Sequence, residues 1–84
     1  MITSNKKGDN MDFKQRARGL REDIDKTQKE LAIIFNTTQR KISRLETGES
    51  EPTLQDIAQY CHYFNKSADY VLGYTNEPKP LPKK

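Results

Sequence analysis

Two helical patterns in this sequence are separated by only two residues, and this short link constrains the fold more than any other feature. The first pattern begins at Thr27, the N-cap of a capping box, and ends at Asn36. The second begins with Thr38 as its N-cap and ends at Gly48. A link of Asn36 and Thr37 is too short for the two helices to run antiparallel, side by side. The sequence therefore predicts a steep crossing, which is typical of a helix-turn-helix unit.

Three further helical patterns flank this unit. Apolar residues recur at helical spacing over residues 12–24 and 53–65, and a short helix fits residues 67–73. The expected core residues are Phe13, Ala17, Leu20, Ile24, Leu31, Ala32, Ile34, Phe35, Ile42, Leu45, Leu54, Ile57, Ala58, Cys61, Phe64, Val71 and Leu72. No stretch has the pattern of a strand. We therefore predict an all-α domain over residues 11–74, a compact five-helix bundle that contains the helix-turn-helix.

The two ends of the chain lack helical patterns. Residues 1–10 have one large aliphatic residue after the initiator Met, so we expect them to be disordered, and Met11 is an alternative start. Residues 75–84 form a Pro- and Lys-rich tail that we also expect to be disordered, although its PxxP spacing would suit a peptide-binding partner. The single cysteine and the lack of a signal or membrane-spanning segment favour a cytoplasmic location.

Charge is distributed unevenly along the chain. Residues 14–44 carry nine Lys or Arg against four acids, a net +5, whereas residues 45–77 carry one Lys against six acids, a net −5. Such asymmetry points to a polyanion on the basic side, nucleic acid first and an anionic membrane second. A solvated charged surface with no such partner is the alternative reading.

The 38–48 helix concentrates this basic character on one face. Ile42 and Leu45 form a narrow apolar stripe, and the opposite face carries Arg40, Ser43, Arg44 and Thr47 without an acid. Arg40 and its neighbour Lys41 lie in the first turn, where the helix dipole disfavours cations by a few tenths of a kcal/mol each. This arrangement suggests an anionic partner.

DNA recognition needs the side chains that this face provides. In the major groove, Gln reads adenine and Arg reads guanine, which makes Gln39, Arg40, Ser43 and Arg44 the candidate base-contacting residues, with about residues 39–47 as the helix in the groove. The candidate backbone contacts are Gln28, Lys29, Thr38, Lys41 and Thr47, with Lys14 or Arg16 as additions.

Catalysis is not expected from this sequence. The only histidine, His62, is expected on the surface, and its neighbour Cys61 is expected in the core, so the two do not suggest a nucleophilic pair. No cluster has metal-ligand spacing and no glycine-rich loop could hold a phosphate. We therefore predict no enzyme activity, no metal and no cofactor.

The run TQKELAIIFNTTQRKISRLETGESEPTLQDIAQYCHYFNKSADYVLG resembles the Cro/C1-type (Xre family) helix-turn-helix domain of lambdoid phage repressors and small bacterial regulators. The resemblance implies a five-helix fold, regulation of transcription, usually repression, and homodimers that bind double-stranded DNA at inverted repeats. It also implies a structural ion pair between Arg21 and Glu46. Asn36 replaces the family's usual glycine, and Glu49 and Glu51 stand where relatives often have basic residues.

A protein-interaction module on the same fold, an antitoxin or adaptor, is the alternative function. Its contact surface would be the acidic half of the chain with the exposed aromatics Tyr63 and Tyr74.

Overall fold

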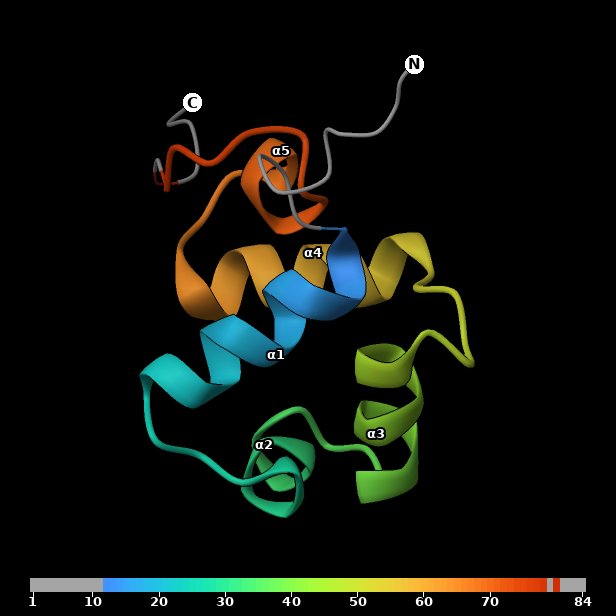
Figure 1. Cartoon of the computed structure of the whole chain (residues 1–84). Coiled ribbons are helices and arrows are strands. Elements are labelled where there is room, and N and C mark those ends of the chain that lie inside the picture. Colours follow the sequence, from blue (N-terminus) through green and yellow to red (C-terminus); the bar gives the residue numbers. More distant parts are fainter. Residues whose placement is uncertain (1–11, 79, 81–84) are drawn as a thin grey trace.

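The helical patterns of the sequence account for the regular structure of the protein. The computed structural model describes residues 12–78 and 80, and in this part of the chain it has five helices and no strand (Figure 1). The helices are α1 (Phe13–Asp23), α2 (Gln28–Ile34), α3 (Gln39–Thr47), α4 (Leu54–Phe64) and α5 (Ala68–Val71). The predicted all-α fold is confirmed. The predictions for residues 1–10, Met11, residue 79 and residues 81–84 lie outside the described residues.

Each helix begins where a short polar side chain satisfies its first turn. The side chains of Asp12, Thr27, Thr38, Thr53 and Ser67 each accept a hydrogen bond from the backbone N–H three residues later. This contact pairs a donor that the helix itself leaves free. The N-terminal ends of the helices are therefore determined by local sequence.

The turn between α2 and α3 has the geometry expected from its length. Asn36 adopts the left-handed conformation with φ of 57°, so it takes the role that glycine has in many helix ends. The Thr37 N–H donates to the carbonyl of Ala32 at 2.8 Å, and the Asn36 N–H donates to that of Ile33 at 3.1 Å. These bonds close α2 and redirect the chain, so that α2 and α3 run in clearly different directions while packing on each other (Figure 1).

Tyr60 of α4 is the centre of the aromatic core. It is 1% exposed, and the rings of Phe13 and Phe35 meet it edge to face with centroids 5.3 and 5.0 Å away. Phe64 stacks on it at 5.9 Å. Such contacts add to the stabilisation that burial of the rings provides. The core thus joins α1 and the end of α2 to α4.

The core face predicted for α4 was wrong in part. Leu54 is 86% exposed and Ala58 is also exposed, whereas Tyr60, which was not predicted to be buried, lies at the centre. The stripe that faces the core is Ile57, Tyr60, Cys61 and Phe64, which has the spacing i, i+3, i+4, i+7. Leu54 is the first residue of the helix and extends into solvent.

Two other predicted core residues lie at helix ends and are more exposed than expected. Ile24 follows the last residue of α1 and is 39% exposed, and Ile34 is the last residue of α2 and is 40% exposed. Leu72 is partly buried beside the core. The apolar periodicity of the sequence continues to the ends of α1 and α2, but Ile24 and Ile34 are less covered by the rest of the domain, so their side chains stay partly exposed.

Candidate nucleic-acid interface

Four side chains of α3 meet at one hollow in the surface. This hollow has a volume of about 540 Å³ and is lined by Gln39, Arg40, Ser43 and Arg44. Gln28 of α2 and Glu49 of the loop after α3 complete the lining. The four residues predicted to contact bases are therefore neighbours on one face. All four side chains could therefore contact the same ligand surface.

The opposite face of α3 holds the helix to the domain. Ile42 is fully buried, Leu45 is 2% exposed and Glu46 is 8% exposed. Thr38 caps the first turn by accepting from the Lys41 N–H at 3.1 Å, and Gly48 ends the helix with φ of 88°. These contacts fix the orientation of α3, so its polar face is presented to solvent in a defined direction.

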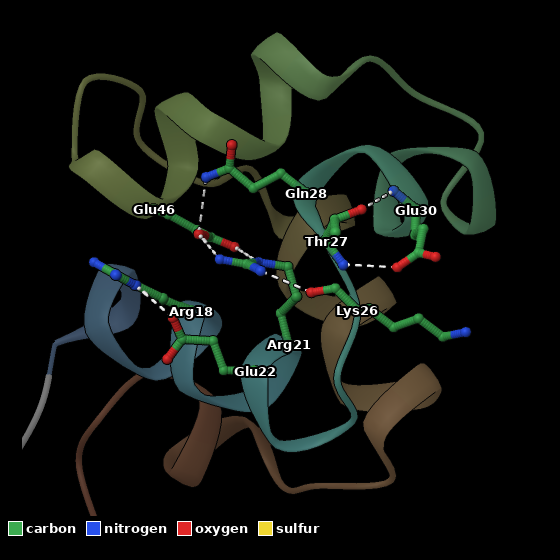
Figure 2. A network of polar contacts seen from close by, with 8 residues as sticks. All are labelled: Arg18, Arg21, Glu22, Lys26, Thr27, Gln28, Glu30 and Glu46. Atoms are coloured by element: carbon green, nitrogen blue, oxygen red, sulfur yellow. Dashed lines mark hydrogen bonds and ion pairs between the residues drawn. The ribbon is translucent and has the colours of Figure 1, made fainter.

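A buried ion pair joins α1 to the end of α3. The Arg21 guanidinium donates from Nε to Glu46 Oε2 at 2.7 Å and from Nη2 to Oε1 at 2.9 Å, and it also donates to the Lys26 carbonyl at 2.7 Å (Figure 2). The two side chains are 11% and 2% exposed. The hydrogen bond with Glu46 raises the pKa of Arg21 above its ordinary value. The ion pair that the family resemblance implies is thus a bidentate salt bridge between two side chains that are largely shielded from solvent.

Gln28 connects this ion pair to the hollow. Its Nε2 donates to Glu46 Oε1 at 3.1 Å (Figure 2). Its side chain also lines the hollow together with the α3 residues. The sequence alone suggested a phosphate contact for Gln28 but did not show this bond to Glu46. The bond limits the positions of the amide, so that Gln28 stands at a defined edge of the hollow.

The predicted backbone-contacting residues do not all share this face. Three of them are exposed: Lys29 on α2, Thr38 at the start of α3 and Thr47 at the end of α3. Lys41 instead lies on the α4 side of α3, where its Nζ is 3.3 Å from Asp56 Oδ1 and its side chain lines a second hollow. A phosphate contact by Lys41 would have to compete with Asp56.

Of the two additional candidates on α1, Arg16 was a wrong prediction. Arg16 is 6% exposed and donates to the carbonyls of Tyr70 and Thr75 and to Asn76 Oδ1, at 2.9, 3.1 and 2.9 Å. Its guanidinium also lies 3.9 Å from the centre of the Tyr70 ring. Arg16 therefore holds residues 70–76 against α1 and is not available to a phosphate. Lys14 is exposed and paired with Asp12 at 2.9 Å.

Glu49 brings a negative charge into the basic hollow. Its Oε1 lies 3.8 Å from Arg44 Nε, and the two side chains are 69% and 46% exposed. The sequence marked Glu49 as unusual for this loop, but only the structure shows which arginine it approaches. The hollow therefore combines guanidinium, amide, hydroxyl and carboxylate groups.

The residues with nucleophilic or metal-binding chemistry lie elsewhere. Cys61 is buried in the core, as predicted, and burial raises the pKa of its thiol; His62 is exposed on α4. Within residues 12–78 and 80, no three His, Cys, Asp or Glu side chains are gathered as a metal site would require. None of the helices described has the length and apolar character needed to cross a bilayer.

Comparison with known proteins identifies the region that contains this surface. The model of a family described as helix-turn-helix matches residues 18–71, which include α2, α3 and the hollow between them. A comparison with curated proteins finds no match to the chain.

Proposed function

Because the chain belongs to the helix-turn-helix family of Cro/C1 type, a family of DNA-binding regulatory domains, we propose that it is a sequence-specific repressor of transcription. In this proposal α3 lies in the major groove of double-stranded DNA. Gln39, Arg40, Ser43 and Arg44 contact base edges. The match covers more than half of the chain, and it includes the residues that line the hollow.

The single observation that carries this proposal is the common placement of those four side chains. An α-helix with its side chains is about 10–12 Å across, and the major groove is about 12 Å wide, so one exposed helix face fits the groove. Arginine forks suit guanine, and glutamine amides suit adenine. On this chain the guanidinium and amide groups line one hollow, whereas the apolar face of the same helix is buried.

The residues around the hollow support a second set of contacts, to phosphates. Gln28 is held at its edge by Glu46. Lys29 of α2, together with Thr38 and Thr47 at the two ends of α3, is exposed and so accessible to phosphates. Contacts of this kind fix the register of a protein on DNA without reading the sequence. We propose that they orient α3 before the bases are read.

The proposed operator is an inverted repeat bound by two copies of the chain. In helix-turn-helix dimers the half-sites are about 34–36 Å apart, one turn of DNA, so that both recognition helices enter the groove from the same side. In Figure 1, α5 lies at the opposite end of the domain from α2 and α3. Tyr74, three residues after α5, is 73% exposed, and we propose this region as the contact with a second copy.

The experiment that tests base reading compares three single substitutions. Arg44→Ala is expected to weaken binding by about 1–3 kcal/mol and to relax the preference at one base position. Lys29→Ala is expected to weaken binding to all sequences evenly and to lower the salt dependence by about one phosphate contact. Arg18→Ala, which removes an exposed arginine of α1 paired with Glu22, is the control for the loss of one positive charge.

These outcomes separate specific from general binding. If Arg44→Ala lowered the affinity for every sequence by the same factor as Arg18→Ala, the proposed reading of bases by α3 would be wrong. The affinities are measured by fluorescence anisotropy at several salt concentrations, because the phosphate contribution depends on salt.

An antitoxin or adaptor function is a second candidate. It is supported by the exposure of the two aromatic side chains expected to contact a partner: Tyr74 is 73% exposed and Tyr63 is 45% exposed. Tyrosine is enriched at protein–protein interfaces. Loss of a co-purifying partner on Tyr74→Ala, with DNA affinity unchanged, would support this function.

A further inference from the structure

Glu49 is the acidic residue in a hollow otherwise lined by cationic, amide and hydroxyl side chains. It follows α3 in the loop after Gly48, and its backbone N–H donates to Thr47 Oγ1 at 3.4 Å. Its carboxylate approaches Arg44, with Oε1 3.8 Å from Nε. The backbone contact and the ion pair together place this carboxylate beside the arginine that is proposed to read a base.

The fold does not need this carboxylate. Both partners of the Glu49–Arg44 pair are well exposed, and an exposed ion pair contributes only about 0–1 kcal/mol to stability. Among the described residues, the Glu49 carboxylate has this ion pair with Arg44 and accepts no hydrogen bond. Replacing it should therefore leave the domain folded and change only the surface that faces the hollow.

On DNA, the same carboxylate would be unfavourable at most positions. Each strand presents one negative phosphate per nucleotide, so an acid at the interface is repelled unless it meets a hydrogen-bond donor. The donors that a major groove offers are the amino groups of bases, N4 of cytosine and N6 of adenine, and carboxylates pair with cytosine N4. An acid beside an arginine thus disfavours every sequence that lacks such a donor.

We propose that Glu49 is a specificity-determining residue that accepts a hydrogen bond from the N4 amino group of a cytosine. This inference rests on the proposed function, since it requires α3 to lie in the major groove. Arg44 and Glu49 would act together: the guanidinium binds O6 and N7 of a guanine, and the carboxylate binds the cytosine of the same or the next base pair. The 3.8 Å between Arg44 Nε and Glu49 Oε1 is close to the rise of about 3.4 Å between successive nucleotides of one strand, so the spacing of the two groups suits neighbouring base pairs.

Glu51 offers a matched control in the same loop. It is an exposed acid two residues later, but it lines a different hollow, which is formed with Asp12, Phe13, Lys14 and Leu45 among others. Glu49→Gln and Glu51→Gln make the same change of charge and size. Only the first removes a carboxylate from the surface that contains Arg44.

The experiment selects bound sites from random DNA with the unmodified chain and with each variant. Dissociation constants are then measured on duplexes in which each position of the selected site carries each of the four base pairs. For Glu51→Gln we expect a uniform gain in affinity and an unchanged base preference. Glu49→Gln keeps an acceptor oxygen but loses the charge that strengthens its hydrogen bond, and its amide suits adenine. We therefore expect the preference for cytosine at one position to fall by roughly fivefold or more, the factor that corresponds to about 1 kcal/mol.

The outcomes distinguish this inference from the proposed function. If the unmodified chain selects a site and both variants change affinity by the same uniform factor, Glu49 is not a specificity-determining residue, although the proposed function stands. If the unmodified chain selects no site, the proposed function is wrong and this inference is wrong with it.

Discussion

Replacing Arg21 with methionine should destabilise the domain far more than the loss of an ordinary ion pair. Among the described residues, the Glu46 carboxylate accepts two hydrogen bonds from Arg21 and one from Gln28 (Figure 2). In Arg21→Met, this carboxylate stays at 2% side-chain exposure, and the Gln28 amide is the donor that remains in the part of the chain that the structure describes. The methionine fills most of the space, so the change tests charge more than packing.

The expected cost is about 3–5 kcal/mol, since removing one partner leaves an uncompensated buried charge. For a chain of 84 residues the free energy of unfolding is roughly 4–13 kcal/mol. The substitution should therefore remove a large part of the stability and lower Tm by roughly 12–40 °C. Arg21→Met together with Glu46→Leu should recover most of this loss, because the charge that lacked a partner is then absent.

The matched control is the Arg18–Glu22 pair on the same helix. Arg18 Nε donates to Glu22 Oε2 at 2.9 Å, a length close to those of the buried pair, but the side chains are 64% and 53% exposed. Arg18→Met should cost about 0–1 kcal/mol because solvent screens an exposed pair. The two pairs thus differ in burial much more than in hydrogen-bond length.

The assay is urea denaturation followed by circular dichroism for five proteins: the unmodified chain, Arg21→Met, Glu46→Leu, the double variant and Arg18→Met. A double-mutant cycle between Arg21→Met and Glu46→Leu should give a coupling energy of about 2 kcal/mol or more. If Arg21→Met cost no more than Arg18→Met, burial would not be the source of the pair's strength, and the reasoning would be refuted.

Three further predictions follow from buried or capping groups. The buried hydroxyl of Tyr60 has no hydrogen-bond partner among the described residues, so Tyr60→Phe should raise stability by about 1 kcal/mol in thermal denaturation. Arg16→Met should cost about 2 kcal/mol or more and should speed hydrogen exchange of the amides after Tyr70, whose carbonyl Arg16 binds. A hydrogen bond from Lys14 lowers the pKa of Asp12 below its ordinary value of 3.8, so this contribution to stability is complete above pH 3.8 and is lost as the pH falls through the lowered pKa. Asp12→Asn keeps a capping oxygen but does not titrate, and it should therefore lose less stability than the unmodified chain when urea midpoints are compared as the pH is lowered below about 4.

Local features of the sequence predicted the helices and the turn well. The hydroxyls of Thr27, Thr38 and Thr53 mark three helix starts, because an N-cap acts within the first turn of its own helix. Asn36 was predicted to end the helical pattern that starts at Thr27, and in the structure it has the left-handed φ of 57° that is common just after a helix. Features of this kind depend on neighbours within a few residues, so a single sequence contains the information.

Features that depend on distant segments were not predictable in the same way. Tyr60 has a hydroxyl and was not assigned to the core, yet Phe13 and Phe35 surround it from other helices. Arg16 resembled a surface cation, but its partners are 54 or more residues away in the sequence. The approach of Glu49 to Arg44 likewise depends on how the loop leaves α3. The roles of the hollow's residues in reading DNA stay predictions.

The most direct test of α3 as a sequence-reading helix is the ratio of two dissociation constants. One is measured on the duplex that the unmodified chain selects from random DNA, and the other on a duplex of the same length and composition in scrambled order, at one salt concentration. We predict that the selected duplex binds at least about 10³ times more tightly, as specific complexes do. A ratio near one would contradict the central claim.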